Sequence, residues 1–387
     1  MAAPRPDVLV VSPYAGGHHA EYLRWIARGL AERGARVAVA AHPALFPDEP
    51  LDADRVRLMG LDRIEAAGSL WAAGRATGGV VREAVEAARA PRVFLPYLDH
   101  AQLALALGMR FRFPVRLSGV LLRATPHERP ASPADRVRQG RKRALLRLAA
   151  RNPHLGAVLA LDPDAVGPLR RLGLDARFLP DPVVPPSPSR SAGEVREALG
   201  VEPGRRLLLL FGSLEERKGV LATLGALGPV PAAAARRLAV VVVGRADPAI
   251  RERLEAAVAE ARRTGAQVLY HERFVPDAEL DDLVTAADVV LAPYLGHVGS
   301  SGAVLRAAAA GTPVLATDAG MVGREVRCHR LGPTVDAADR GALAAALART
   351  VEEPGAAFDP DGAAAYARDH GLDRFVDTIC DALALDR

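Results

Sequence analysis

Short apolar runs alternate with segments of helical period along the first half of the chain. The apolar runs cover residues 8–11, 37–40, 56–59, 93–95 and 115–120, and the clearest helical segments lie near residues 17–33 and 80–89. Such alternation is typical of βαβ units. It predicts a parallel sheet with helices on both faces.

The second half repeats this pattern after a proline-rich segment. Residues 180–191 contain five prolines and no periodicity that would form a core, so they predict an interdomain linker. Beyond them, helical segments separate further apolar runs at residues 207–211, 239–243, 268–270, 289–292, 314–316 and 334–335. This is a second doubly wound pattern.

The two patterns together predict an α/β protein with two Rossmann-like, doubly wound domains that face a central cleft. We expect the first domain to cover residues 1–182 and the second to cover residues 183–360. Residues 361–387 resemble terminal helices outside the second sheet, and we expect them to pack back toward the first domain. Ligands of such domains bind where strands end at their carboxyl side.

Composition fits two ordinary cores in 387 residues, of which 50% are hydrophobic. Cys328 and Cys380 are the only cysteines, too few for a disulfide framework or a cysteine metal site. The first residues do not follow the plan of a signal peptide, and no run of about 18 uncharged apolar residues occurs. We therefore expect a cytoplasmic protein, with contact at the inner face of the membrane as a further option.

Positive charge is concentrated in one part of the first half. Residues 110–151 carry 12 basic side chains and two acidic ones, although the net charge of the whole chain is only +4. On a helix over residues 136–151, Val137, Leu145 and Leu148 fall near one side and arginines elsewhere. This stretch suits an anionic ligand, an acceptor or an anionic membrane surface, and a plain solvated face is the alternative. With 4% aromatic residues, nucleic-acid binding is disfavoured.

Two loops of the second half carry candidate chemistry. The strand at 207–211 runs into Gly212-Ser213-Leu-Glu-Glu-Arg217-Lys218-Gly219, where glycines enclose a cationic pair. A strand–loop–helix junction of this kind suits phosphate, because helix amides and basic side chains both attract anions. An ordinary turn with exposed charges is the alternative. Lys218 and Lys142 are the only lysines, which draws attention to Lys218.

The second loop follows the strand at 289–292 and contains Gly299-Ser300-Ser301-Gly302 at the start of an alanine-rich helix. Glycines permit close backbone approach, and hydroxyls and free amides suit a diphosphate. Ser300 or Ser301 could equally be a helix N-cap.

These residues resemble the GT-B glycosyltransferases of family 4, the group of phosphatidylinositol mannosyltransferases and sucrose synthases. The resemblance rests on Phe211-Gly212…Lys218-Gly219 and on Leu305-Arg306…Gly311-Thr-Pro313, with residues 270–276 and 288–294 between them. The family usually has two glutamates eight positions apart, where this chain has Val298 and Arg306, and an arginine where it has Ser213. Arg306 or Arg217 could supply the missing charge.

The resemblance also directs attention to strand ends of the first domain. Family members place a glycine-containing loop after the first strand, here Tyr14-Ala-Gly16-Gly17-His18-His19, against donor phosphates and acceptor. The family's usual histidine, which is catalytic or orients the acceptor, would fall near residues 119–120; here it has either moved to His127 or is absent. Other acceptor-orienting candidates follow later strands; the full acceptor set is His18, His19, Asp99, His100, Arg123 and His127.

The resemblance implies transfer of a sugar from a nucleotide diphosphate sugar to an acceptor hydroxyl, with retention and with no cofactor or metal beyond the donor. Lys218 and Arg217 would stabilise the departing diphosphate, aided by Gly212, Ser213, Gly299, Ser300, Ser301, Gly302 and Arg306. The acceptor could be a small molecule, a glycan or a lipid-linked acceptor. Two alternatives remain: a binding or regulatory protein without turnover, and a coupling enzyme that uses a nucleotide-activated cyclitol or a non-hydroxyl acceptor.

Overall fold

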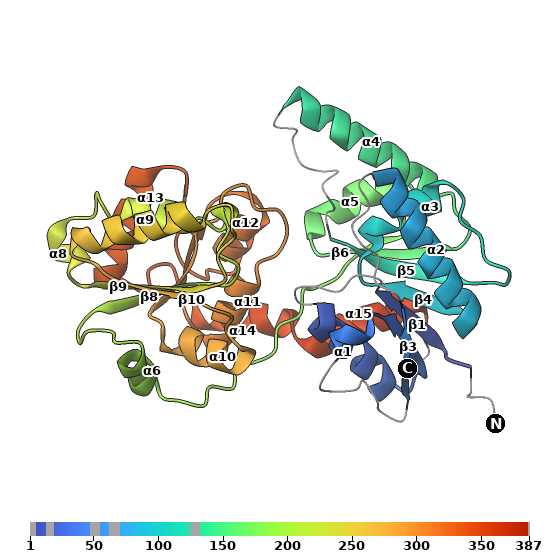
Figure 1. Ribbon diagram of the computed structural model, residues 1–387, viewed down its shortest axis with the longest axis horizontal. Coiled ribbons are helices and arrows are strands. Elements are labelled where there is room, and N and C mark those ends of the chain that lie inside the picture. Colours follow the sequence, from blue (N-terminus) through green and yellow to red (C-terminus); the bar gives the residue numbers. More distant parts are fainter. Residues whose placement is uncertain are drawn as a thin grey trace. The chain divides into compact units, whose positions relative to one another are not determined.

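A computed structural model describes residues 5–12, 19–46, 55–61, 70–122, 124 and 132–385 of the chain (Figure 1). The chain forms two compact units: unit 1 consists of residues 1–180 and 372–387, and unit 2 of residues 181–371. None of the helices in the described ranges combines the length and the hydropathy needed to cross a bilayer.

Unit 1 contains a seven-stranded parallel sheet in the order β3-β2-β1-β4-β5-β6-β7. Its strands are β1 (Val8–Ser12), β2 (Val37–Ala41), β3 (Val56–Gly60), β4 (Arg92–Leu95), β5 (Arg116–Leu121), β6 (Leu155–Ala160) and β7 (Ala176–Phe178). Each of the five apolar runs of the first half overlaps one of these strands, and only Val115 falls outside, one residue before β5. The sequence pattern missed β6 and β7.

Helices cover both faces of this sheet because successive side chains of a strand point to opposite faces. Val8 and Val10 pack with residues of α1 and α15, whereas Leu9 and Val11 pack with residues of α2, α3, α4 and α5. These helices are α1 (His19–Glu32), α2 (Leu70–Ala88), α3 (Gln102–Ala106), α4 (Pro133–Ala149), α5 (Pro163–Arg171) and α15 (Leu372–Leu383), with short 3₁₀ turns at η1 (Pro43–Leu45) and η2 (Leu98–His100).

Unit 2 contains a six-stranded parallel sheet in the order β10-β9-β8-β11-β12-β13. Its strands are β8 (Arg206–Phe211), β9 (Leu238–Gly244), β10 (Gln267–Glu272), β11 (Val289–Ala292), β12 (Val314–Thr317) and β13 (Thr334–Val335). All six predicted apolar runs of the second half fall in these strands. The expected pair of Rossmann-like, doubly wound α/β units is confirmed.

The helices of unit 2 also divide between two faces. Leu208 and Leu210 of β8 pack with α7, α9 and α13, and Leu207 and Leu209 pack with α10, α11 and α14. The elements are α6 (Ala192–Ala198), η3 (Glu216–Lys218), α7 (Val220–Ala226), α8 (Ala232–Ala235), α9 (Arg251–Ala261), η4 (Arg262–Thr264), α10 (Asp277–Ala286), α11 (Gly302–Ala310), α12 (Gly320–Cys328), α13 (Arg340–Glu352) and α14 (Pro360–Asp369).

The proline-rich segment is attached to unit 2 near both of its ends. The carboxylate of Asp282, on α10, accepts hydrogen bonds from the backbone N–H of Ser189 (2.6 Å) and Arg190 (3.1 Å) and from Nε of Arg190 (2.9 Å). Nearer the boundary, the N–H of Val183 donates to the carbonyl of His370 (2.8 Å). The chain therefore passes from unit 1 to unit 2 at Pro180–Asp181.

The two C-terminal helices pack in different units, α14 in unit 2 and α15 in unit 1. Ala363 and Tyr366 of α14 are buried with α11 in unit 2. Phe375, Val376 and Ile379 of α15 are buried with α1 and β1 in unit 1. The return to unit 1 thus begins at Leu372 rather than at residue 361.

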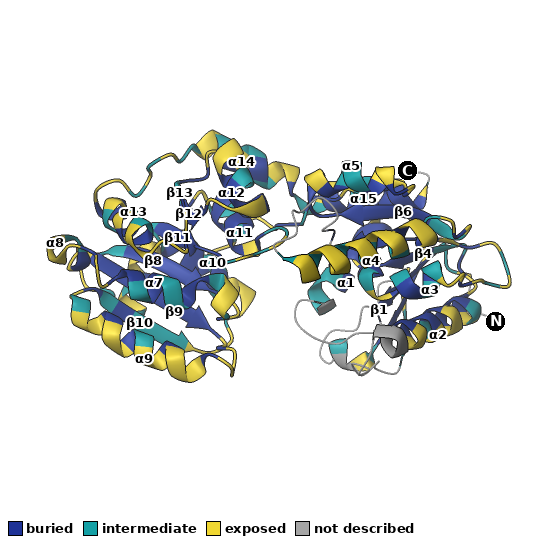
Figure 2. Cartoon of the chain, turned by 90° about the horizontal axis from the view of Figure 1, so that it is seen from above, coloured by how far each residue is buried: buried dark blue, intermediate teal, exposed yellow. Residues whose placement is uncertain are grey.

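Helix α4 contacts the core of unit 1 through Leu146 and Ala149. Leu146 and Ala149 are buried, while Val137 is 74% exposed and Leu148 is 46% exposed. Figure 2 shows most of α4 as exposed surface. Of the three apolar residues that the sequence placed near one side, Leu145 is therefore half-buried and the other two are exposed, whereas residues 146 and 149, one turn apart, face the core of unit 1.

Candidate functional site

Two loops meet at the carboxyl ends of β8 and β11, where the strand order of unit 2 reverses. Such a switch point is the usual ligand site of an open α/β sheet. The N–H of Leu295, after β11, donates to the carbonyl of Arg217, after β8 (2.8 Å). Gly219 has φ +72°, and a Cβ placed on it would lie 1.9 Å from the carbonyl oxygen of Pro293. Only glycine permits this approach of the two loops.

Lys218 is held against Tyr294 across this contact. Its Nζ donates to the hydroxyl of Tyr294 (3.1 Å) and lies 4.4 Å from the centroid of the Tyr294 ring. The ring is 4% exposed. Within the described residues no carboxylate pairs with Lys218, so its positive charge remains available to an anion.

Ser301 joins Tyr294 to the start of α11. Its Oγ lies 2.9 Å from the Tyr294 hydroxyl and accepts a hydrogen bond from the N–H of Val304 (3.3 Å), so it is the N-cap of the helix. Ser300 donates its hydroxyl to Asp181. Gly299 has φ +92°, and Gly302 is exposed at the first helical position. Both serine hydroxyls therefore have partners in the protein, and the first amides of α11 remain without intrahelical partners.

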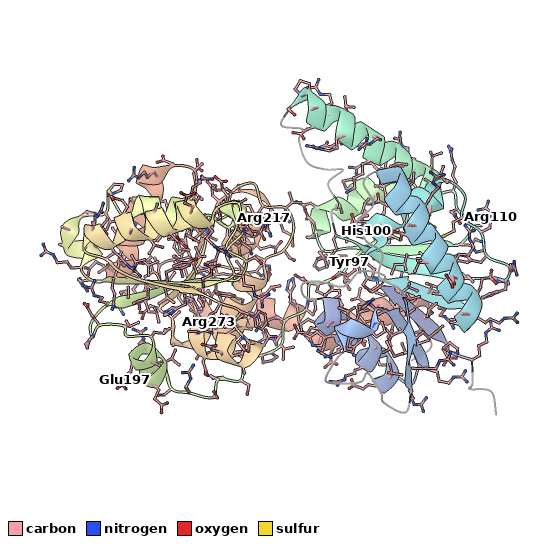
Figure 3. The ribbon with its side chains drawn as sticks, in the orientation of Figure 1. Tyr97, His100, Arg110, Glu197, Arg217 and Arg273 are labelled. Atoms are coloured by element: carbon pink, nitrogen blue, oxygen red, sulfur yellow. The ribbon has the colours of Figure 1, made fainter. Side chains whose placement is uncertain are left out.

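Arg217 is the second cation of the site (labelled in Figure 3). Its Nε and Nη2 donate to the carboxylate of Glu215 (2.6 and 3.3 Å). Its Nη1 lies 3.1 Å from Nδ1 of His297, whose Nε2 lies 2.9 Å from the carbonyl oxygen of Ser300. Glu215 thus compensates the charge of Arg217, in contrast to Lys218.

His297 lies in an environment that disfavours its charged form. Burial lowers the pKa of its imidazole below the ordinary value, and the nearby charges of Lys218 and Arg217 lower it further, against opposing effects of Ser300 and Glu215. At neutral pH the imidazole is therefore uncharged.

Gly212 and Ser213 form the first part of the β8 loop. Gly212 has φ +105° and is exposed, and its N–H donates to the carbonyl of Val243 (3.1 Å). Ser213 is exposed, and its carbonyl accepts from the N–H of Glu215 (3.0 Å). Both residues lie in the same loop as Lys218, with open surface beside them.

Arg306 is engaged with a neighbouring helix. Its guanidinium pairs with Asp277 and with Asp281 of α10, at 3.3 Å in the second case, and its side chain is 24% exposed. The structure brings Arg306 together with these two carboxylates and not with Lys218 or Arg217. Alignment of the sequence with the family motif could not predict these ion pairs, because both partners of Arg306 lie on another helix.

The candidates of unit 1 are only partly described. Asp99 lies in η2, accepts from the N–H of Leu122 after β5 (2.7 Å), and lies 3.9 Å from Nζ of Lys142 on α4. His100, labelled in Figure 3, is exposed next to it. Five other candidates, Gly17, His18, Arg123, His127 and the side chain of His19, lie outside the described residues.

Sequence reasoning did not select Tyr294, His297, Glu215 and Asp181 as site residues. The first two stand in the loop already singled out for Gly299–Gly302, two and five residues after β11. Their place in that loop was a usable signal. Their bonds to Lys218 and Arg217 depend on the contact between two loops that are about 80 positions apart, and no local pattern encodes such a contact.

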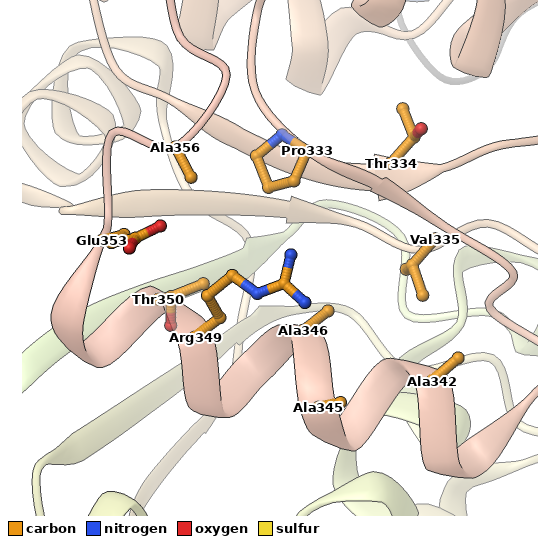
Figure 4. A pocket seen from close by; sticks show the side chains of 10 residues that line it. All are labelled: Pro333, Thr334, Val335, Ala342, Ala345, Ala346, Arg349, Thr350, Glu353 and Ala356. Carbon is orange, nitrogen blue, oxygen red and sulfur yellow. The ribbon is translucent and has the colours of Figure 1, made fainter.

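A separate pocket of about 260 Å³ lies between β13 and α13 of unit 2. Figure 4 shows its lining, which is mainly alanine, proline and valine with Arg349 and Glu353. None of the predicted site residues lines it. Across the described ranges, no cluster of three or more His, Cys, Asp and Glu side chains is arranged to hold a metal ion.

Part of unit 2 is similar in sequence to a known protein family. Residues 205–353 match the family described as "Glycosyl transferases group 1". Unit 2 carries a glycosyltransferase domain. This domain contains β8, β11 and both loops of the site, so the predicted resemblance to glycosyltransferases is confirmed.

Two curated relatives and one solved structure extend the comparison. This chain is 32% identical over 215 residues to alpha-maltose-1-phosphate synthase of Mycobacterium tuberculosis (52% of this chain, 51% of that protein). It is 30% identical over 267 residues to D-inositol 3-phosphate glycosyltransferase of Thermomonospora curvata (63% and 57%). These matches span about half the length of the relatives.

The structure of HepE of Anabaena in complex with UDP superposes with a TM-score of 0.70 and 17% identity, covering 98% of this chain and 99% of that one. At this identity the similarity establishes the fold. The GT-B fold with its two Rossmann-like domains, expected from the sequence, is thereby confirmed.

Proposed function

We propose that the protein transfers a sugar from a nucleotide diphosphate sugar to an acceptor hydroxyl. The glycosyltransferase domain and the names of the relatives support sugar transfer, and the HepE complex with UDP supports a uridine nucleotide as a first candidate. One observation carries the assignment of the site: the uncompensated ammonium group of Lys218 is fixed on Tyr294, beside the start of α11 and at the switch point of the sheet.

In this proposal unit 2 binds the donor. As the bond between sugar and diphosphate breaks, negative charge develops on the leaving diphosphate. Lys218, the free N–H groups of Arg217 and the first amides of α11 would stabilise that charge, and fixed donors do so without reorganising during the reaction. We expect retention at the anomeric carbon, as in the glycosyltransferases that the sequence resembles. We also expect activity to survive chelation of divalent metals, since these groups supply positive charge themselves.

Unit 1 would bind the acceptor. Asp99 and His100 follow β4 at the carboxyl side of its sheet, which is where ligands of such sheets bind. Asp99 accepts a hydrogen bond from the residue after β5 and is paired with Lys142. Its role would therefore be to stabilise this edge of the sheet as well as to contact an acceptor. The candidate acceptors are small molecules, glycans and lipid-linked acceptors.

The exposed side chains of helix α4 support the hypothesis that the acceptor lies at an anionic membrane surface. Val137 and Leu148 are exposed on it between arginines at 136, 138, 141, 143 and 147. Apolar side chains among basic ones suit the boundary of an anionic bilayer. The protein should sediment with acidic vesicles at low salt and be released at high salt. Failure to sediment even at low salt would leave an anionic soluble acceptor or a plain solvated surface.

A second candidate function is nucleotide-sugar binding without turnover. It is favoured by Val298 and Arg306, which stand where the family resemblance places glutamates. A thermal-shift screen with UDP, GDP, ADP and TDP and their sugars tests both candidates, because a ligand of the folded state raises the melting temperature. Release of free nucleotide from the stabilising sugar nucleotide, with an acceptor mixture, supports the transferase. Binding without any release supports the second candidate.

A further inference from the structure

Arg217 is restrained from two sides, and this leaves a defined part of it free. A guanidinium has five N–H groups and no acceptor. Glu215 takes two of the five and His297 takes one, so two remain for a ligand among the contacts of the described residues. A planar fork held in advance binds phosphate with less loss of conformational freedom than a mobile one.

The hydrogen bonds of His297 determine the state of its ring. Arg217 can only donate, so Nδ1 of His297 must be an unprotonated acceptor. The carbonyl oxygen of Ser300 can only accept, so Nε2 must carry the proton. The geometry therefore demands the neutral imidazole with its hydrogen on Nε2.

The imidazole is itself well anchored. Its centroid lies 4.8 Å from that of the Tyr294 ring, the same ring that holds Lys218. Ser300, which accepts from Nε2, donates its own hydroxyl to Asp181 at the first position of unit 2. A ring fixed in this way can hold Arg217 in one position.

We infer that His297 is a positioning residue, whose neutral imidazole holds the guanidinium of Arg217 in place for the diphosphate of the donor. The inference rests on the proposed function, since it takes the diphosphate to be the ligand of Arg217. Without His297, Glu215 would be the remaining partner of Arg217 and would draw the guanidinium toward itself.

The inference has a consequence for pH. Protonation would place an N–H of His297 against an N–H of Arg217, so the contact requires the neutral ring. The charged and titratable groups around the imidazole are Arg217, Lys218 and Glu215 from the β8 loop, Tyr294 from its own loop and Asp181 beyond Ser300. Because burial and the two cations lower its pKa, the ring should become charged only below its ordinary titration range.

Calorimetric titration with UDP between pH 5 and pH 8 tests this inference on three proteins. At pH 7.5, His297→Leu should bind UDP about three- to tenfold more weakly than the parent, the effect of losing one hydrogen bond. His297→Asn places an amide oxygen near the position of Nδ1 and should bind more tightly than His297→Leu. As the pH falls, the parent should lose affinity relative to His297→Asn, whose side chain does not titrate.

The ratio of parent to His297→Asn cancels the ionisation of UDP itself, which occurs in the same range. His329→Asn is the matched control and should follow the parental profile; His329 is the C-cap of α12 and is paired with Glu325. Superimposable profiles of parent and His297→Asn, or parental affinity in His297→Leu, would overturn the inference.

Two further measurements separate this inference from the proposed function. Nitrogen NMR of the histidine rings in the full chain should show the Nε2–H form for His297 at pH 7.5, and the Nδ1–H form would overturn the inference without reference to nucleotide. If Lys218→Ala weakens UDP binding while the His297 variants do not, only the inference falls. If Lys218→Ala and His297→Leu both bind UDP as the parent does, the donor site has been assigned wrongly and both fall.

Discussion

Lys218 has no carboxylate partner among the described residues while its side chain is restrained, and this combination is what a diphosphate site requires. Contact with the face and the hydroxyl of Tyr294 fixes the ammonium group without neutralising it. Arg217, one position earlier, is held by a carboxylate instead. At the scale of single residues, the two neighbouring cations therefore differ in how much charge they offer.

Replacing Lys218 by alanine should weaken binding of a nucleoside diphosphate by about 1.5–3 kcal/mol, the contribution of a hydrogen bond to a charged group. Binding of the free nucleoside should change little, because it lacks the phosphates. Calorimetric titration of both ligands measures the difference. The matched control is Lys142→Ala, which removes the other lysine, in unit 1, and should retain the parental affinity. Equal affinity in the parent and in Lys218→Ala would contradict the assignment of Lys218 to the diphosphate.

Arg306→Glu should lower the free energy of unfolding of unit 2 by about 1 kcal/mol or more. The substitution removes the pairs with Asp277 and Asp281 and puts a third carboxylate beside them. Chemical denaturation followed by a probe in unit 2 measures this loss. A variant of unchanged stability with weaker diphosphate binding would show instead that Arg306 reaches the ligand, as the sequence suggested.

At the scale of elements, the site depends on how closely the loops after β8 and β11 approach one another. Gly219 makes this approach possible, and the hydrogen bond from Leu295 to Arg217 fixes it. The approach sets Lys218 against Tyr294 and Arg217 against His297 at the same time. A small separation of the loops would therefore disturb both cations.

Gly219→Ala should destabilise the protein by about 1–3 kcal/mol and weaken diphosphate binding as well, because the new methyl group would collide with backbone and require a strained φ. Gly225→Ala is the control in the same region. Gly225 lies inside α7 with nothing within 4 Å of an added Cβ, so this change should stabilise by up to about 1 kcal/mol. Thermal melts and UDP titrations of both variants test the pair; equal behaviour would contradict the loop contact.

Elements were more predictable than contacts. Eleven apolar runs were each recovered as strands, because buried parallel strands are nearly continuous in apolar residues. β6 contains a glycine and β7 has three residues, so neither stood out. Gly212, Lys218 and Ser301 could be selected from their loops, whereas the partners of Arg306 and the exposed side of α4 depend on tertiary packing that a period alone does not fix.

At the scale of the whole molecule, each crossing between the units ends in a fixed segment of unit 2. Asp282 holds the outgoing segment at Ser189 and Arg190, and the hydrogen bond of Val183 with His370 joins it to the returning one. The hydrogen bonds from Arg190 and Ser189 lower the pKa of the nearly buried Asp282 carboxyl to about 2. The charged carboxylate therefore contributes to the attachment of this segment.

Asp282→Asn should accelerate hydrogen exchange at the amides of Ser189 and Arg190 near neutral pH. Since the folded pKa lies below the unfolded value of about 3.9, this stabilisation is complete above pH 4 and is lost as the pH falls toward 2. Parent and variant should thus converge at low pH. Exchange measured by mass spectrometry at pH 3 and pH 6, corrected for intrinsic rates, tests this; a difference that is constant with pH would contradict it.

The placement of α15 in unit 1 has a consequence for how the protein is made. Phe375, Val376 and Ile379 close the face of the sheet formed by β1 and covered by α1, yet they follow all of unit 2 along the chain. During translation the ribosome must therefore complete unit 2 before it supplies the helix that unit 1 lacks. Unit 2, a single continuous segment, can bury its core first, while apolar surface of unit 1 stays open to chaperones or to other nascent chains. The part of the protein that is synthesised first is thus the part that finishes folding last.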